Sequence, residues 1–169
     1  VFCAAQKPKA QAVIESVAKE KDVPLTLADI QMELPALLLH GEHQKQNATL
    51  ATTVAKSLTD EFPVEEAAIR EGLAKVHWSA RAQSWQEGPR QFIFDAAHNP
   101  ASMRTLVDIL RDNHSGKAPA ILLGMSQEKN WREMCRLIAP LAGRVMAVPT
   151  SSQKSVSPDS IAEICSEFC

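Results

Sequence analysis

The sequence predicts an α/β fold with a mostly parallel sheet. Strand-like stretches alternate with stretches of helical periodicity along most of the chain, and helices are the usual connections between parallel strands. The strand-like stretches are short apolar runs bounded by Gly, Pro or charged residues. The helix-like stretches repeat apolar residues at spacings of three and four, which places them on one face of a helix.

The first part of the chain combines strands with helices. Pro8 suits the first turn of a helix, where its missing N–H needs no partner, and Glu65 and Glu66 lie where the helix dipole favours negative charge. Gly41 is expected to end a strand. We predict strands at residues 1–4, 23–28 and 36–40, and helices at residues 8–21, 42–58 and 63–73.

A connector separates this part from the rest of the chain. Residues 76–82, which include Trp78 and Arg81, interrupt any amphipathic period, so we place a boundary between a domain at residues 1–76 and a domain at residues 77–169. The second domain continues the alternation. We predict strands at residues 91–95, 120–123 and 144–148, and helices at residues 103–110, 131–138 and 158–168.

Composition excludes several classes of protein. The chain has 169 residues, of which 45% are hydrophobic and 22% charged, as in ordinary globular proteins. A formal net charge of −2 without a basic stripe argues against a nucleic-acid partner. No apolar run approaches the roughly 20 residues that cross a bilayer, so no membrane partner is expected. We also expect a monomer.

The start of the chain and its cysteines bear on localisation. Val1–Ala5 has neither a basic leader nor a long hydrophobic region, so we expect a fragment or a processed product. Cys3, Cys135, Cys165 and Cys169 form no CxxC pair, and a reducing cytoplasm fits them best. A soft-metal site at Cys165 and Cys169 is the less favoured interpretation, because no second ligand pair is near in sequence.

The strongest candidate site follows the strand predicted at residues 91–95. That strand delivers the Asp95 carboxylate to a sheet edge, the kind of place where open α/β folds bind ligands. His98 and Asn99 come at the mouth of the helix that Pro100 begins, where backbone amides favour anions. The structural alternative is that Asp95 and Asn99 only cap this helix, and the residues alone favour neither interpretation.

A second candidate site begins at Gly41. Gln44 and Asn47 lie three residues apart on one helical face, so two amide side chains can grip one polar edge, such as that of adenine. The alternative is a polar first turn with capping roles. A metal pair of His40 and His43 is disfavoured because the Gly break separates them and a third ligand is missing.

The connector supplies a third candidate. Arg81, on a linker between lobes, can reach a phosphate when the lobes close, whereas the alternative is a solvated Arg beside a Trp anchor. The loop at residues 124–129 follows a predicted strand at the same sheet edge. It lacks the GxxxxGK[ST] pattern and is not a P-loop.

In this order and spacing, these segments resemble folylpolyglutamate synthases and bifunctional dihydrofolate synthases of the Mur ligase superfamily. The resemblance rests on residues 41–48, 78–81, 95–100 and 124–129 and extends over about residues 1–155. It implies that residues 1–76 are the end of a central ATPase domain. Residues 77–169 are then a Rossmann-like carboxy-terminal domain that lacks its last strand.

The chain departs from the family pattern at a few positions. Ser79-Ala80 replaces Pro-Gly before the connector Arg, Ala96 replaces Gly after the strand Asp, and residues 128–130 read Glu-Lys-Asn where Asp-Lys-Asp is common. The resemblance implies that the P-loop, the magnesium ligands and the carbamylated lysine of the family lie outside this chain. The resemblance therefore implies that these 169 residues are inactive alone.

The resemblance also implies a reaction and its residues. ATP phosphorylates a carboxylate of folate or dihydropteroate, and the amino group of L-glutamate attacks the acyl phosphate. By motif match, Asn47 and Gln44 contact adenine, Arg81 the terminal phosphates and Asp95 the nucleotide. His98 lies where phosphate and glutamate meet, and Mg²⁺ accompanies ATP. Positioning and charge stabilisation supply most of such catalysis.

Two other functions remain as alternatives. One is a different Mur-type amino-acid ligase, because the segment at residues 95–100 is shared more widely than the folate substrate. The other is a non-catalytic nucleotide-binding or interaction domain. A hydrolase that uses Asp95 and His98 is disfavoured, because no Ser stands on a G-x-S-x-G elbow.

Overall fold

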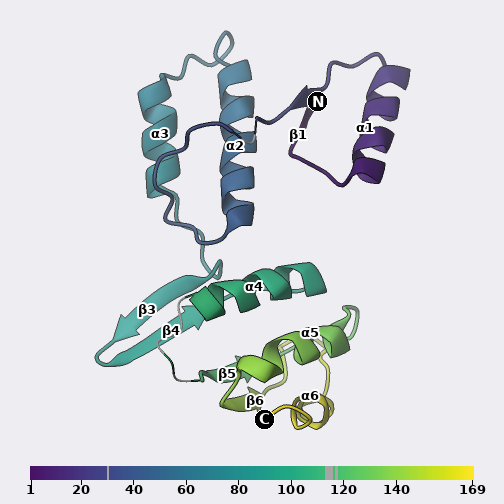
Figure 1. Ribbon diagram of the computed structural model, residues 1–169, viewed down its shortest axis with the longest axis vertical. Helices are drawn as coiled ribbons and strands as arrows, with labels where there is room; N and C mark the ends of the chain where they lie inside the picture. Colours follow the sequence, from purple (N-terminus) through teal and green to yellow (C-terminus); the bar gives the residue numbers. More distant parts are fainter. Residues whose placement is uncertain (30, 113–115, 117) are drawn as a thin grey trace. The chain divides into compact units, whose positions relative to one another are not determined.

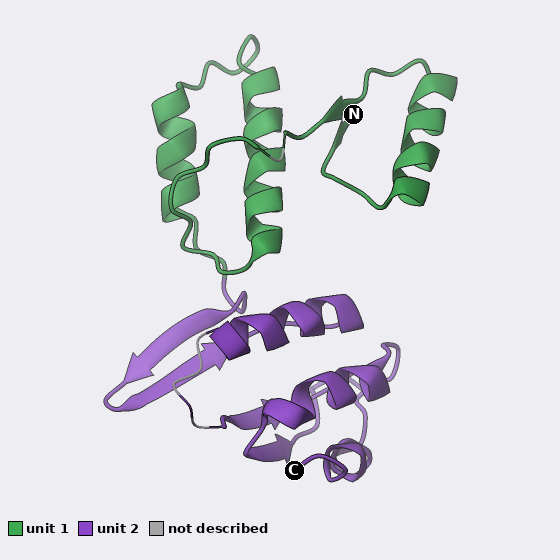
Figure 2. Cartoon of the chain, viewed as in Figure 1, with its two compact units in different colours: residues 1–78 green, residues 79–169 purple. Residues whose placement is uncertain are grey.

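The chain forms two compact units, residues 1–78 and residues 79–169 (Figure 2). The computed structural model describes residues 1–29, 31–112, 116 and 118–169. The division between Trp78 and Ser79 falls inside the predicted connector. Each unit contains a two-stranded parallel sheet together with helices, which confirms the predicted α/β class.

The first unit contains β1 (Phe2–Cys3), α1 (Pro8–Glu20), β2 (Thr26–Leu27), α2 (Glu42–Ser57) and α3 (Glu66–Lys75), in that order (Figure 1). In the parallel pair β1–β2, Phe2 lies opposite Thr26, and α1 is the connection between the two strands. Pro8 stands at the start of α1, as predicted. An ion pair of 3.4 Å between Lys56 and Glu66 joins α2 to α3. All three helices predicted for this part of the chain are present.

The strand predicted at residues 36–40 is wrong. This segment has an irregular backbone with bends, and within the described part of the first unit only β1 and β2 pair as strands. A strand needs a neighbour that accepts and donates its backbone hydrogen bonds. The apolar run at residues 34–39 has the composition of a strand, but composition does not supply that neighbour.

The second unit contains the remaining elements. They are β3 (Gln83–Glu87), β4 (Arg90–Phe94), α4 (Pro100–Asp112), β5 (Ala120–Leu123), α5 (Trp131–Ile138), a short 3₁₀ helix (Ala139–Leu141), β6 (Arg144–Ala147) and α6 (Pro158–Cys165). β5 and β6 pair in parallel, with Ala120 opposite Arg144. The bounds predicted for β5 and α5 are those observed.

The hairpin β3–β4 corrects two expectations. β3 was not predicted, because its residues are mainly polar and show no apolar alternation. β4 lies where a strand was expected, but it pairs antiparallel with β3, with Trp85 opposite Phe92. Gly88 makes the tight turn between them with a positive φ of 56°. Asp95 therefore follows a strand of an antiparallel hairpin, and not a strand of the predicted parallel sheet.

The hydrophobic core of the second unit lies among α4, α5, α6 and the parallel strands. Buried side chains from each of these helices meet there: Met103, Val107, Met134, Cys135, Ile138, Ile161, Ile164 and Cys165. Leu123 of β5 joins the same cluster. These helices present apolar residues at helical spacing, so the pattern that predicted them is also the pattern that buries them.

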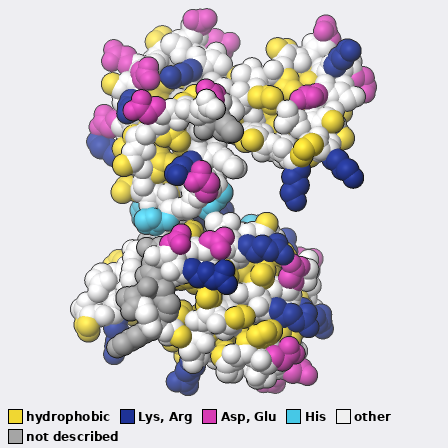
Figure 3. Space-filling view, in the orientation of Figure 1, with side chains coloured by type: hydrophobic (Ala, Val, Ile, Leu, Met, Phe, Trp, Pro, Cys, Tyr) yellow, Lys and Arg dark blue, Asp and Glu magenta, His cyan; other side chains and the backbone are white. Residues whose placement is uncertain are grey.

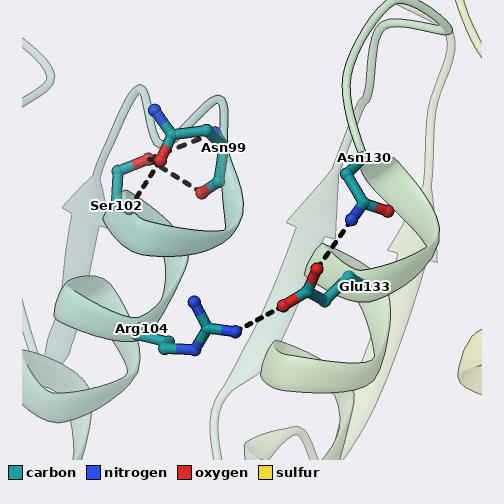
Figure 4. A network of polar contacts seen from close by, with 5 residues as sticks. All are labelled: Asn99, Ser102, Arg104, Asn130 and Glu133. Carbon is teal, nitrogen blue, oxygen red and sulfur yellow. Dashed lines mark hydrogen bonds and ion pairs between the residues drawn. The ribbon is translucent and has the colours of Figure 1, made fainter.

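Polar contacts join α4 to α5 at the surface of this core (Figure 4). Arg104 of α4 forms an ion pair with Glu133 of α5. The Asn130 side chain, at the start of α5, donates to the second carboxylate oxygen of Glu133 at 2.6 Å. Glu133 therefore links the two helices and holds the loop that precedes α5.

The surface carries charges of both signs. On the face displayed in Figure 3, Lys and Arg side chains are interspersed with Asp and Glu in each unit. Ion pairs between exposed residues, such as Lys45 with Glu42 at 2.8 Å, contribute little to stability because water screens them. No helix in the described part of the chain is long and apolar enough to span a membrane.

The cysteines differ sharply in exposure. Cys3, Cys135 and Cys165 are buried, whereas Cys169 is exposed. Burial, with a smaller effect from the neighbouring Cys165, raises the pKa of the Cys135 thiol from 9.0 to about 12. Because the folded pKa lies above the unfolded value, ionisation of this thiol favours unfolding. Its contribution to the free energy of unfolding is fully present below about pH 9 and is lost as pH rises toward 12.

We expect Cys169 to be the one thiol that reacts rapidly with iodoacetamide in the folded chain. Alkylation needs an accessible thiolate, and Cys135 and Cys165 are buried with raised pKa values. Peptide mass spectrometry after brief labelling checks this expectation. In a Cys169→Ser variant the rapid reaction should disappear, and rapid labelling of Cys135 without unfolding would contradict it.

Candidate functional site

Asp95 holds two segments of backbone at the end of β4. Its Oδ1 accepts a hydrogen bond from the Ala97 amide at 2.7 Å, and its Oδ2 accepts one from the Ala82 amide at 2.8 Å. The structural alternative, in which Asp95 caps α4, is therefore wrong for this residue. Asp95 fastens the turn around Arg81 to the segment that carries His98. Each carboxylate oxygen keeps capacity for a further hydrogen bond.

Asn99 is the N-terminal cap of α4, as the structural alternative predicted. Its Oδ1 accepts from the Ser102 amide at 2.9 Å (Figure 4). The Met103 amide donates to the backbone carbonyl of Asn99 at 3.0 Å. The Ser102 hydroxyl accepts from the amides of His98 and Asn99 at 3.1 and 3.2 Å. These two amides are thus satisfied internally, which reduces the anion-binding capacity expected of this helix start.

His98 presents its ring to solvent above this cap. Its Nδ1 lies 3.1 Å from the Ala96 carbonyl oxygen, and its Nε2 lies 3.5 Å from Nδ2 of Asn99, which can only donate. Both contacts favour the neutral tautomer in which Nδ1 carries the proton and Nε2 is an acceptor. His98 can accept a hydrogen bond from a bound group when that group replaces Asn99 Nδ2 at Nε2.

Arg81 lies at the centre of a strained turn. The residues on either side, Ala80 and Ala82, have positive φ angles of 55° and 46°, a region that side chains other than Gly rarely adopt. The Ala96 amide donates to the Ala80 carbonyl at 2.9 Å, so the turn runs beside the Asp95–His98 segment. Among the described residues, no ion-pair partner engages the half-buried Arg81.

Ala80→Gly is expected to raise the free energy of unfolding by about 0.5–1 kcal/mol. Gly removes a left-handed strain of about 1–2 kcal/mol and loses part of this gain to greater freedom in the unfolded chain. Ala80 also stands where Gly is usual in the resembling family. Chemical denaturation measures the change. As a matched control, Ala162→Gly in the exposed face of α6 should destabilise by about 1 kcal/mol, and destabilisation by Ala80→Gly would contradict the strain.

Gln44 and Asn47 contact each other in the first unit. Asn47 Nδ2 donates to Gln44 Oε1 at 3.1 Å, and Gln44 Nε2 lies 3.0 Å from a ring nitrogen of His43. Gln44 is buried and Asn47 exposed. The sequence predicted the shared face but not this bond. Of the two amides, Asn47 is therefore the one exposed to solvent, and Gln44 accepts its hydrogen bond.

The described pockets of the first unit include a cavity that the sequence did not predict. Its volume is about 760 Å³, and its lining includes Leu34, Leu37, His40, Lys45, Gln46 and Thr49. Gln44 and Asn47 are absent from this lining, so they lie on another side of α2. The irregular backbone of residues 34–40 creates the cavity wall, and nothing in the sequence indicated that bend.

The loops after β5 and β6 meet at the carboxyl ends of these parallel strands. Gln127 Nε2 donates to the Ser155 carbonyl at 3.0 Å, and Lys154 pairs with Glu128. A Cβ on Gly124 would lie 3.3 Å from the Val148 carbonyl oxygen, so the close approach favours Gly there. Sequence reasoning singled out residues 124–129 but missed 150–155, because only strand pairing brings the two loops together.

The described residues contain no cluster of three or more His, Cys, Asp or Glu that could hold a metal ion. Cys169 Sγ contacts the Cys165 carbonyl oxygen at 3.5 Å, and the side chain of Cys165 faces Cys135.

Comparison with known proteins gives matches over much of the chain. Residues 80–168 match the model of the Mur ligase, glutamate ligase domain family. The folylpolyglutamate synthase of Lacticaseibacillus casei is 28% identical over 130 residues, which cover 76% of this chain and 29% of that protein. The dihydrofolate synthase/folylpolyglutamate synthase of Bacillus subtilis is 27% identical over 106 residues, covering 62% and 24%. The chain thus spans less than a third of these curated relatives.

Solved structures share the fold. The folylpolyglutamate synthase of Thermotoga maritima matches with a TM-score of 0.77 and 22% identity, covering 99% of this chain and 45% of that one. The Mycobacterium tuberculosis folylpolyglutamate synthase complexed with ADP matches with a TM-score of 0.83 and 22% identity, covering 99% and 42%. At 22% identity, this likeness shows a shared fold and no more.

Proposed function

The chain belongs to the Mur ligase, glutamate ligase domain family, and on that premise we propose that it is part of an ATP-dependent ligase that adds L-glutamate to folate or dihydropteroate. The family is the one expected from the motifs. The single observation that carries the proposal is the bond from Ala82 to Asp95 Oδ2, because it joins the turn around Arg81 to the segment that carries His98. Arg81 and His98, which the resemblance assigns to one reaction, thus belong to segments that this hydrogen bond joins.

In the proposed reaction a substrate carboxylate takes the terminal phosphoryl group of ATP, and the glutamate amine then displaces phosphate from the acyl phosphate. Arg81 stabilises charge on the transferred phosphoryl group, because its guanidinium carries a fixed positive charge on a pre-formed turn. His98 accepts a hydrogen bond from the incoming amine through Nε2, where the amine replaces the 3.5 Å contact from Asn99. Asp95 contacts the nucleotide through its remaining acceptor capacity.

The adenine contact is assigned to Asn47. Its exposed side chain keeps a carbonyl oxygen and one N–H after donating to Gln44, and adenine offers one donor and one acceptor along the same edge. Gln44 supports this contact by fixing the amide of Asn47. The proposal therefore retains both residues and gives them different roles.

We propose that these 169 residues do not turn over substrate alone. They contain no GxxxxGK[ST] segment to hold the phosphates of ATP, and no described cluster could hold Mg²⁺. The P-loop and the magnesium ligands are assigned to an amino-terminal domain outside this chain. The complete protein is proposed to be a cytoplasmic monomer.

The test is an ADP-release assay on the complete gene product. Dihydropteroate, tetrahydrofolate and a peptidoglycan precursor are compared, each with and without L-glutamate. We expect ADP only when a pteridine substrate and glutamate are both present. If the peptidoglycan precursor is the only one of the three substrates that supports ADP release, the protein is another Mur-type ligase. If none of the three substrates supports ADP release, a non-catalytic nucleotide-binding domain is indicated.

A further inference from the structure

We propose that Gln83 is a positioning residue for Arg81, and that it acts by holding the backbone of the turn in which Arg81 lies. The inference rests on the proposed function of Arg81 and names a residue to which neither the motifs nor the comparisons assign a role. Gln83 Oε1 accepts a hydrogen bond from the Ala80 amide at 3.1 Å. This bond closes the turn from Ala80 to Gln83.

The turn needs such support because its backbone is strained. Ala80 and Ala82, on either side of Arg81, both have left-handed φ angles, and such angles persist only where neighbouring groups hold them. Without support, either residue would relax toward negative φ and swing the Arg81 side chain to a new direction. The direction of the guanidinium is therefore set by the bonds that fix its neighbours.

Three hydrogen bonds fix these neighbours. The Ala80 carbonyl accepts from the Ala96 amide at 2.9 Å, and the Ala82 amide donates to Asp95 Oδ2 at 2.8 Å. Both of these partners belong to the segment after β4. The third hydrogen bond, from the Ala80 amide to Gln83, involves the other strand of the hairpin, so both strands contribute to holding the turn.

The hairpin holds Gln83 itself in place. Gln83 is the first residue of β3, where it lies opposite Phe94, the residue before Asp95. The residue is half-buried, and the strand register fixes the backbone position from which its side-chain Oε1 reaches the Ala80 amide. What the turn requires from this position is an acceptor. Glu keeps an acceptor at this reach, whereas Met has a similar length without an oxygen.

The first experiment measures the turn directly. In the 169-residue chain, amide hydrogen exchange by NMR should show the Ala80 amide exchanging up to about tenfold faster in Gln83→Met, and at the parent rate in Gln83→Glu. Gln91→Met, in the same hairpin but bonded to Ser84, is the matched control and should leave Ala80 unchanged. Unchanged Ala80 exchange in Gln83→Met, with an unchanged melting temperature, would overturn the inference.

The second experiment measures the consequence for turnover in the complete gene product. Misplacing a catalytic group by a small distance costs up to about a hundredfold in rate, so Gln83→Met should lower kcat about tenfold to a hundredfold with little change in the KM for glutamate. Gln83→Glu should restore kcat. Equal losses in the Met and Glu variants would overturn the positioning role.

A double variant separates this inference from the proposed function. If Gln83 acts through Arg81, Gln83→Met should have no further effect on kcat in an Arg81→Ala background, whereas independent structural damage would add. Full additivity would overturn the inference while leaving the role of Arg81 intact. Normal turnover in Arg81→Ala alone would defeat the proposed site, and the exchange of Ala80 would still decide whether Gln83 holds the turn.

Discussion

Arg81→Ala is expected to lower kcat for ADP formation by about 10²–10³-fold in the complete gene product. The guanidinium is the group that we assign to the charge of the transferred phosphoryl group, and charge stabilisation supplies most of the catalysis in such a reaction. Among the described residues, no ion pair competes for Arg81. Steady-state kinetics with saturating ATP measures the effect.

Two variants control this prediction. Arg81→Lys keeps the positive charge but loses the planar set of donors, so it should recover only part of the rate. Arg90→Ala, at the exposed turn of the same hairpin, removes an Arg from the second unit without touching the site and should keep the parent kcat. A parent-like kcat in Arg81→Ala would contradict the assignment, provided that its melting temperature is also unchanged.

Ile161→Ala is expected to lower the free energy of unfolding of the second unit by about 2–5 kcal/mol. Ile161 of α6 has 0% exposure and lies in the core cluster with Met134 and Ile138. Truncation removes buried methyl groups and leaves a cavity that the surrounding core residues fill only partly. Urea denaturation followed by circular dichroism measures the change.

The matched control for Ile161 is Leu122→Ala. Leu122 of β5 is 65% exposed, so its truncation should cost less than about 1 kcal/mol. Ile161→Val, which removes one methyl group, should fall between them at about 0.5–1.5 kcal/mol. Similar losses in Ile161→Ala and Leu122→Ala would show that Ile161 is not part of the supporting core.

Local periodicity predicted the helices well. The helix from Trp131 to Ile138 has the predicted bounds, because its apolar residues follow the helical repeat and are also its buried residues. The strand at residues 36–40 failed for the opposite reason, since an apolar run does not reveal whether a partner strand exists. β3 was missed because hairpin pairing, rather than apolar content, makes it a strand.

The candidate site shows the same division. Residue types and spacing selected Gln44, Asn47, Arg81, Asp95 and His98, and they also identified Asn99 as a possible cap. They did not reveal that Gln44 is buried and accepts a hydrogen bond from Asn47, nor that Asp95 accepts a hydrogen bond from the Ala82 amide in the turn. These facts depend on contacts between residues whose distance along the chain carries no signal.

The sequence by itself determined the α/β class, the helices and the family, because each depends on repeats or motifs within short segments. Only the tertiary structure determined the backbone conformation of the turn that contains Arg81. This turn is set by left-handed angles at Ala80 and Ala82 and by bonds from Gln83, Asp95 and Ala96. The physical reason is that a strained turn is stable only in the presence of its partners, and those partners meet it only after the hairpin has formed.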